Sequence, residues 1–183
     1  MNDFPKPIVG CCAYSGTGKT TLLAAVIPAL IDRGIAVSVI KHTHHGFDID
    51  QPGKDSYRLR LAGARQVVLA SSQRTVCMTE NYKDLTEPVL ADALSELKPE
   101  LVDLVLVEGF KHETFAKILL HRPALGRPLL FPLSSDIIAI ASDEALAAGD
   151  LPLLDLNQPR QVAEFIITHF NLANKPMPRM KRS

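Results

Sequence analysis

The chain has 183 residues, of which 46% are hydrophobic and 22% are charged. This length and composition predict one ordinary globular domain with a full hydrophobic core. Twenty Lys and Arg residues balance twenty Asp and Glu residues, so no overall basic field favours nucleic acid as a partner. The sequence shows no membrane-spanning apolar run, no signal peptide and no C-x-x-C pair among its three cysteines. We therefore expect a cytoplasmic protein with buried, reduced cysteines and with neither nucleic acid nor a membrane as partner.

A phosphate-loop motif follows the first predicted strand. The sequence AYSGTGKTT at 13–21 fits G-x-x-x-x-G-K-[ST], except that Ala13 replaces the first glycine. The apolar run 8–12 predicts a buried strand before the loop, and helical spacing over 22–31 predicts a helix that stops at Gly34. Such a helix directs unpaired N–H groups at a phosphate, while the lysine contacts outer phosphates and the hydroxyl binds Mg²⁺. The predicted nucleotide ligands here are Ser15, Gly16, Thr17, Gly18, Lys19, Thr20 and Thr21.

Strands and helices alternate along the rest of the chain. Further strands are expected at 35–40, 104–107, 118–120, 137–141 and 151–154. Further helices are expected at 54–62, at 85–97 and from a cap at Asn157 to Phe170. The apolar runs 66–70 and 75–78, joined by SSQR, predict a β-hairpin. The pattern predicts an α/β, P-loop NTPase-like fold with three layers and a mostly parallel central sheet. This domain is predicted over 1–173, and the basic segment 174–183 is predicted to be a disordered tail.

Two acidic residues end predicted strands at the edge where parallel sheets bind their ligands. Glu108 directly follows the strand 104–107, where P-loop enzymes place the acid that holds Mg²⁺; a solvated strand-end carboxylate is the alternative. Asp103 begins the same strand, about 16 Å away at roughly 3.3 Å per residue, so it is a poor candidate. Asp143 ends another strand, where a carboxylate accepts the N1 and N2 protons of guanine; a helix cap before EALAAG is the alternative.

The loop KHTHHGFDIDQPGKDS combines histidines with acidic residues. His42, His44 and His45 are possible Zn²⁺ or Ni²⁺ ligands, although a single loop without a second cluster does not close such a site. Asp48 and Asp50 suit Mg²⁺ better, because a hard cation takes carboxylate oxygens and a loop after the second strand can fold over phosphates as a switch. We expect catalytic roles for Lys19, Glu108 and Asp48, and metal binding by Thr20, Asp50 and Glu108.

Three segments together resemble the molybdopterin-guanine dinucleotide biosynthesis protein B family: AYSGTGKTTLL, IKHTHHGFDIDQPGKDSYRLRLAGA and LVLVEGFKHE. The similarity extends over the chain up to its basic tail. It implies a cytoplasmic, homodimeric adapter of molybdenum cofactor synthesis that binds GTP, whereas the Mg²⁺ prediction comes from the phosphate loop and the acidic residues. The implied partners are the molybdenum cofactor guanylyltransferase, which joins GMP to molybdopterin, and molybdopterin or its guanine dinucleotide.

Two other functional classes share parts of this pattern. A nickel-insertion accessory GTPase is expected to carry an N-K-x-D motif and a Cys/His site, and the sequence has neither. An ATP-dependent biosynthetic enzyme resembling dethiobiotin synthetase has a similar loop and a strand ending in VEG, but Asp143 and the histidine-rich loop fit it less well. No clear arginine finger is present, so an adapter with weak GTPase activity is the expected function.

Overall fold

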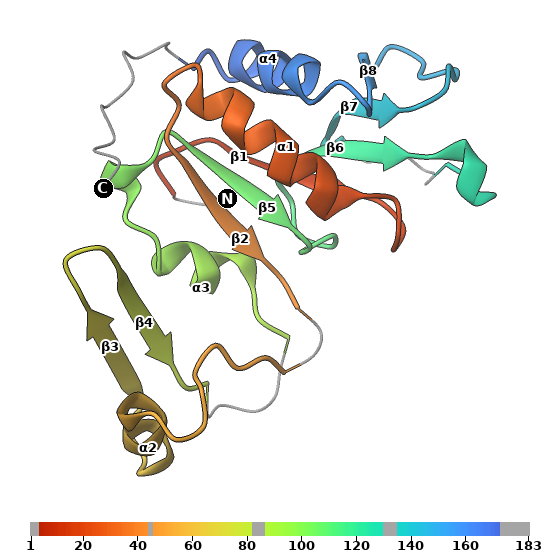
Figure 1. Ribbon diagram of the computed structural model, residues 1–183. Coiled ribbons are helices and arrows are strands. Elements are labelled where there is room, and N and C mark those ends of the chain that lie inside the picture. The colour runs from red at the N-terminus through yellow and green to blue at the C-terminus, as the bar shows by residue number, and fades with distance from the viewer. Residues whose placement is uncertain (1–3, 44–45, 82–86, 130–134, 173–183) are drawn as a thin grey trace. The chain divides into compact units, whose positions relative to one another are not determined.

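A computed structural model describes residues 4–43, 46–81, 87–129 and 135–172 (Figure 1). The chain divides into two compact units, each of which is considered by itself. The phosphate-loop unit comprises Met1–His42 and Val89–Ser183, and the hairpin unit comprises Thr43–Pro88. The domain predicted over 1–173 thus spans both units, and the predicted tail 174–183 lies outside the described residues.

The phosphate-loop unit is built on a six-stranded sheet in the order β2-β5-β1-β6-β7-β8. Every neighbouring pair of strands is parallel, so all six strands end at one edge (Figure 1). This arrangement confirms the predicted parallel sheet. The strands are β1 (Ile8–Cys12), β2 (Val37–Lys41), β5 (Leu104–Glu108), β6 (Ala116–His121), β7 (Ile137–Ser142) and β8 (Leu153–Asp155).

Helices cover both faces of this sheet, which confirms the three predicted layers. On one face, α1 (Lys19–Ile31) and α4 (Pro159–His169) pack in a single cluster with alternate β5 residues such as Leu104. On the other face, α3 (Leu90–Ser95) packs against the intervening β5 residues such as Val105. The alternation follows from the two-residue repeat of a strand and explains why β5 is apolar throughout. Two short 3-10 helices, η1 (Pro99–Leu101) and η2 (Pro123–Leu125), precede β5 and follow β6.

Two helix starts differ from the sequence prediction. The helix predicted at 85–97 begins only at Leu90, and of the residues before it 85–86 lie outside the described ranges. Pro88 explains the late start, because a proline disfavours helical backbone in the residue before it. The cap predicted at Asn157 is also wrong: Gln158 precedes α4, and the Asn157 N–H donates to Asp155 Oδ1 at 2.8 Å. Pro159 sets this start, since its fixed φ suits the first helical position.

The hairpin unit contains α2 (Asp55–Leu61), β3 (Gln66–Ala70) and β4 (Thr75–Thr79). The two strands pair antiparallel from Gln66 opposite Thr79 to Ala70 opposite Thr75, which confirms the predicted hairpin. Ser71 closes the turn, because its hydroxyl accepts the N–H groups of Gln73 and Arg74 at 3.2 and 3.0 Å. This unit has a sheet of its own, so its strands add nothing to the pairing of the six-stranded sheet.

The cysteines are free thiols in different environments. Cys11 in β1 is buried, and burial raises its pKa to about 12. Cys12 is half-buried, and Cys77 in β4 is exposed, so the expectation that all three are buried is wrong for Cys77. The short β4 has only one neighbouring strand to cover it. None of the helices in the four described ranges has the length and apolar character needed to cross a membrane.

Candidate nucleotide and metal site

The phosphate loop connects β1 to α1 at the carboxyl edge of the sheet. Gly16 and Gly18 have φ values of +81° and +101°, and a Cβ on either would meet no atom within 4 Å. Glycine is therefore required there for its left-handed backbone rather than for space. Gly18 precedes α1, and no side chain in the described structure caps this helix end. The first-turn N–H groups are thus left for an anion, as the motif predicts.

Two side chains close the loop on itself. Lys19 Nζ donates to the carbonyl oxygens of Ala13 and Tyr14 at 3.1 and 2.9 Å. Thr17, which is 3% exposed, donates from Oγ1 to the same Tyr14 oxygen at 3.0 Å. Ala13 packs against the core beneath the loop, which explains why a small side chain can replace the first glycine of the motif. The ammonium therefore lies within the loop where phosphates bind, while the predicted ligands Ser15 and Thr21 are exposed.

Glu108 lies beside the hydroxyl of the phosphate loop. Thr20 Oγ1 donates to Glu108 Oε1 at 2.6 Å, although the two residues are 88 positions apart. The Glu108 side chain is only 14% exposed, which excludes the alternative of a freely solvated strand-end carboxylate. Asp103 lies at the other end of β5, where its Oδ2 accepts the Ala36 N–H at 3.1 Å, in agreement with its exclusion. A hydroxyl and a carboxylate in contact form a donor set that suits Mg²⁺.

Asp143 follows β7 at the same edge. Its Oδ2 accepts a hydrogen bond from Arg122 Nη1 at 2.6 Å, whereas its buried Oδ1 has no hydrogen-bond partner among the described residues. The helix-cap alternative is wrong, since residues 144–150 form no helix and Ser142 Oγ accepts the Glu144 N–H instead. A surface hollow of about 320 Å³ opens beside Asp143. The end of β7 with the residues after it, β8 and the start of α4 line this hollow. The lining residues are Ser142, Asp143, Glu144, Ala145, Leu153, Leu154, Asp155 and Gln161.

Asp48 and Asp50 belong to the hairpin unit and surround Arg60 of α2. Asp48 Oδ2 lies 2.5 Å from Arg60 Nη2, and Glu80 Oε1 lies 2.9 Å from Nη1. The N–H of Asp50 and the Arg60 guanidinium lower the pKa of Asp48 below its usual value. Asp50 accepts a hydrogen bond from the Ser56 hydroxyl at 2.9 Å, and its side chain is 6% exposed.

The contacts with Arg60 oppose the binding of a metal ion to Asp48 and Asp50 in the hairpin unit. It would have to displace the guanidinium that already neutralises Asp48, so the catalytic role of Asp48 and the metal-binding role of Asp50 stay predictions. Within the described ranges, no group of three or more His, Cys, Asp or Glu residues is placed to hold a metal. His42 lies in the phosphate-loop unit, whereas His44 and His45 lie outside those ranges.

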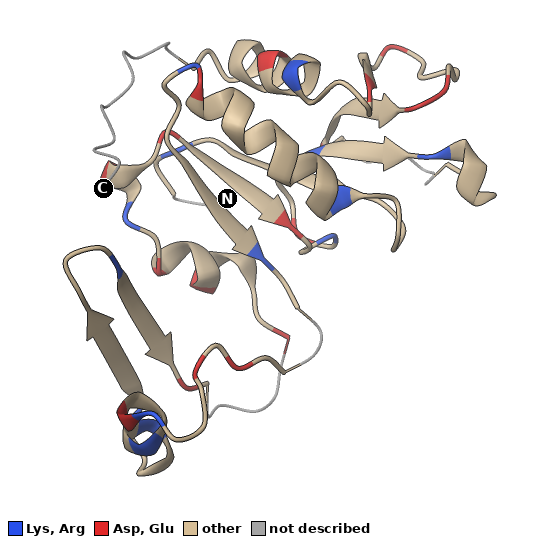
Figure 2. Ribbon diagram, in the orientation of Figure 1, with Lys and Arg blue, Asp and Glu red and all other residues tan. Residues whose placement is uncertain are grey.

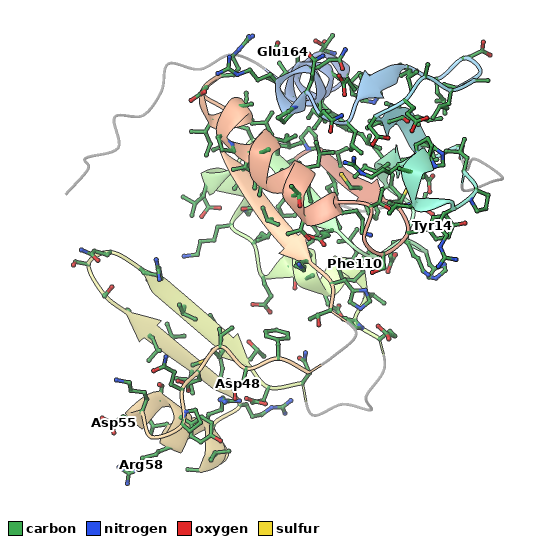
Figure 3. The ribbon with its side chains drawn as sticks, turned by 45° about the vertical axis from the view of Figure 1, so that its right-hand side comes forward. Tyr14, Asp48, Asp55, Arg58, Phe110 and Glu164 are labelled. Carbon is green, nitrogen blue, oxygen red and sulfur yellow. The ribbon has the colours of Figure 1, made fainter. Side chains whose placement is uncertain are left out.

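Sequence reasoning missed two cations at the carboxyl edge of the sheet. Lys41 ends β2 with Nζ 3.5 Å from Glu108 Oε2, and Arg122 follows β6 and binds Asp143. Figure 2 shows basic and acidic residues at the ends of neighbouring strands along this edge. The rule that singled out Glu108 and Asp143 applies equally to both, since the ends of parallel strands meet at one edge. Figure 3 labels Tyr14 of the phosphate loop. The guanidinium carbon of Arg127 lies 5.9 Å from the centroid of the Tyr14 ring.

Comparisons with known proteins show which family this chain resembles. The model of the family described as "Molybdopterin guanine dinucleotide synthesis protein B" matches residues 8–143. A "Molybdopterin-guanine dinucleotide biosynthesis adapter protein" of Escherichia coli K12 is 49% identical over 162 residues, covering 88% of this chain and 91% of that protein. A protein of the same name from Haemophilus influenzae is 46% identical over 168 residues, covering 90% and 92%.

Solved structures show the same fold. MobB of Bacillus subtilis has a TM-score of 0.66 at 23% identity, covering 90% of this chain and 98% of that one. A crystal structure of molybdopterin-guanine biosynthesis protein B has a TM-score of 0.64 at 24% identity, covering 90% and 99%. At these identities the structural likeness concerns the fold, whereas the family follows from the sequence matches. This chain belongs to the molybdopterin-guanine dinucleotide synthesis protein B family.

Proposed function

We propose that this protein is a GTP-binding adapter of molybdenum cofactor biosynthesis. In this role it assists the guanylyltransferase that joins GMP to molybdopterin, and it contacts molybdopterin or its guanine dinucleotide. Relatives at 46% and 49% identity are named as adapter proteins of this synthesis. The observation that carries the nucleotide-binding part is the 2.6 Å contact between Thr20 and Glu108 beside an uncapped helix start.

Each residue of the phosphate-loop unit has a separate task in this proposal. The N–H groups of 15–21 hold the phosphates, and Lys19 supplies positive charge to the outer ones. Thr20 and Glu108 hold Mg²⁺ directly or through water. When bound, Mg²⁺ neutralises phosphate charge and polarises the phosphoryl oxygens. Glu108 suits this task because it is mostly removed from solvent and already hydrogen-bonded to the Thr20 hydroxyl.

Asp143 is proposed to read the guanine base. Arg122 fixes one carboxylate oxygen of Asp143, and the other oxygen is buried without a hydrogen-bond partner in the described structure. A buried acceptor of this kind costs free energy until a donor arrives, and guanine supplies N1–H and N2–H donors. The hollow of about 320 Å³ beside it has the size of a small ligand pocket. Adenine has no such donors, so GTP should be preferred.

Slow hydrolysis by the isolated protein fits an adapter. Fast phosphoryl transfer needs an additional positive group on the transition state, and unassisted P-loop GTPases hydrolyse at about 10⁻⁴ to 10⁻³ s⁻¹. Arg122 is engaged by Asp143 and Arg127 lies on Tyr14, so neither arginine contacts Thr20 or Glu108. A single-turnover rate near 1 s⁻¹ without a partner would argue for a complete enzyme instead.

The hairpin unit is proposed to supply contact surface in a cytoplasmic homodimer or with the guanylyltransferase. It exposes several large apolar side chains, and apolar surface of this kind is typical of protein interfaces. The residues concerned are Phe47, Ile49, Leu59, Leu61 and Val68, which are 56–74% exposed. Sedimentation of the purified protein would measure its oligomeric state, and a monomer at micromolar concentration would contradict the dimer.

Calorimetric titration with GTP and ATP, each with and without Mg²⁺, tests the nucleotide proposal. GTP should bind more tightly than ATP, and Asp143→Asn should reduce this preference by about 5- to 100-fold, the range for a lost bidentate base contact. Asp150→Asn, an exposed carboxylate of the following loop, is the matched control and should leave the preference unchanged. Equal parental affinities would exclude the guanine-specific role, and an ATP preference would favour the biosynthetic-enzyme class.

A pull-down from cytosol with and without GTP tests the adapter role. The guanylyltransferase and bound pterin should be retained by the parent protein and lost in a Lys19→Ala variant that no longer holds nucleotide. If the parent and the variant retained equal amounts of the guanylyltransferase, partner binding would not depend on the nucleotide site.

A further inference from the structure

The end of β2 faces the proposed metal ligand across one strand spacing. Lys41 and Glu108 are direct partners in the parallel register of β2 and β5, and both are the last residues of their strands. Lys41 Nζ lies 3.5 Å from Glu108 Oε2, while Glu108 Oε1 accepts the Thr20 hydroxyl at 2.6 Å. The carboxylate therefore has one oxygen for the phosphate loop and one for the lysine.

The backbone holds Lys41 in this position. The N–H of His42 donates to the Glu108 carbonyl at 2.8 Å, and the His42 ring stacks on Phe110 at a centroid distance of 4.6 Å. Gly109 lets the two segments approach, since a Cβ there would lie 2.5 Å from the His42 Cβ. These contacts follow directly after β2 and β5 and hold the two strand ends close together. The Lys41 side chain itself is 56% exposed.

Lys19, the cation of the phosphate loop, does not pair with Glu108. Lys19 Nζ binds the Ala13 and Tyr14 carbonyl oxygens, and the ion pair of Glu108 within the described ranges is with Lys41. A mostly buried carboxylate beside incoming phosphates repels them unless a positive charge compensates it. Lys41 provides that charge on the oxygen that the Thr20 hydroxyl leaves open.

We propose that Lys41 is a charge-balancing residue that competes with Mg²⁺ for Glu108. In the absence of a divalent cation the ammonium neutralises the carboxylate and lets a nucleotide enter. Lys41 would give up Glu108 when Mg²⁺ is bound there, so Lys41 sets the Mg²⁺ concentration at which the nucleotide complex forms. This inference rests on the proposed nucleotide and metal site and adds a residue that determines its Mg²⁺ dependence.

The proposal predicts two effects of opposite sign for Lys41→Gln. GTP binding in EDTA should weaken by about 2- to 5-fold, because Glu108 then repels the phosphates without compensation. The Mg²⁺ concentration for half-maximal GTP binding should fall by about 2- to 5-fold, because the competing ammonium is gone. A loss of local structure would weaken binding under both conditions, so the two signs separate the proposed role from a merely structural one.

The experiment is a fluorescence titration of a labelled GTP analogue at fixed Mg²⁺ concentrations and in EDTA. Lys41→Arg keeps the charge and should behave like the parent. Lys98→Gln removes the same charge from an exposed site before η1 and controls for net charge. In a Glu108→Gln background, Lys41→Gln should no longer shift the Mg²⁺ dependence, since the two residues act through one contact.

The outcomes separate this inference from the proposed function. If the parent binds GTP without any dependence on Mg²⁺, the proposed metal site itself is wrong. If the parent depends on Mg²⁺ but Lys41→Gln titrates like the parent, or needs more Mg²⁺, only the competition is wrong. An equal shift in Lys98→Gln, or an unchanged shift in the Glu108→Gln background, would also overturn it.

Discussion

Both units pair acidic side chains with a basic side chain, but the two arrangements have different consequences. In the hairpin unit, one guanidinium contacts Asp48, Asp50 and Glu80, and the Arg60 side chain is only 17% exposed. In the phosphate-loop unit, Glu108 meets a lysine that is 56% exposed and a threonine hydroxyl. The fork of an arginine binds several oxygens at once, whereas a solvated ammonium is a single exchangeable charge. The hairpin cluster is thus a structural clasp, whereas the ion pair of Glu108 with Lys41 is the one that can exchange more easily.

Position in the fold accounts for this difference. Arg60 joins α2 to the loop before it, through Asp48 and Asp50, and to the residue after β4, through Glu80. It therefore ties together a unit that has only a two-stranded sheet. Glu108 lies at the end of a central parallel strand, where a six-stranded sheet and the helices on both of its faces already supply the stability. A side chain there is available for binding without holding the fold together.

Lys19→Ala should produce the largest change, and only in binding. Removing the ammonium from the phosphate loop should weaken GTP binding by about 30-fold or more, roughly 2 kcal/mol, because a charge-assisted contact to the phosphates is lost. Calorimetric titration would measure it. The free energy of unfolding should change little, since Lys19 bonds only to loop carbonyls. Parent-like GTP affinity would contradict the phosphate-loop assignment.

Arg60→Ala should have the opposite profile and destabilise the hairpin unit clearly more than its matched control does. The change leaves Asp50, whose side chain is 6% exposed, without its neighbouring positive charge. Arg58→Ala is the matched control, because Arg58 is 78% exposed and its distance to Asp55 is 3.9 Å. Arg58→Ala should lower the free energy of unfolding by less than about 0.5 kcal/mol. Amide hydrogen exchange of 46–81 would measure both, and equal effects would show that Arg60 is no clasp.

The core of this fold was predictable from sequence because its signals are local. The apolar runs 8–12 and 104–107, the glycines of the phosphate loop and the SSQR hairpin each act within a few residues. Parallel strands then bring Glu108 and Asp143 to one edge, so the rule for strand ends identified both. The late start of α3 was missed, although Pro88 signals it, because the apolar pattern alone extends farther back.

Partners that are distant in sequence could not be predicted. The pairing of Arg60 with Glu80 depends on how α2 and β4 pack, and no periodicity encodes that contact. The bond from Arg122 to Asp143 likewise depends on the parallel pairing of β6 with β7. The division into two units also escaped prediction, since the hairpin unit has ordinary composition and no linker of Gly, Ser or Pro marks its borders.

Gly109→Ala should reduce stability by about 2 kcal/mol and also disturb nucleotide binding. Gly109 has φ +104°, and a Cβ would lie 2.5 Å from the Cβ of His42, so both backbone strain and a clash result. Gly149→Ala is the control, because its φ is +62° but a Cβ there meets nothing within 4 Å. Gly149→Ala should lower the free energy of unfolding by about 1 kcal/mol through backbone strain alone. Thermal unfolding would rank the two variants, and equal losses would mean that His42 moves aside freely.

The smallest predicted effect is the pH dependence that Asp48 gives to the hairpin unit. The Asp50 N–H and Arg60 hold the pKa of Asp48 below its unperturbed value of 3.8. A carboxyl group with a lowered folded-state pKa stabilises the fold above its unfolded pKa, and this contribution is lost as the pH falls through the folded pKa. Asp48→Asn should therefore be less stable than the parent at pH 6, and the difference in the free energy of unfolding should shrink below about pH 4.

Denaturant unfolding of both proteins at pH 6 and at about pH 2.5 measures this difference at each pH. Asp55→Asn, at an exposed carboxylate, is the control for the substitution itself. A gap that stays constant over this range would show that Asp48 gains nothing from its charge, and the contrast between the hairpin clasp and the proposed metal site would then rest on Asp50 and Glu80.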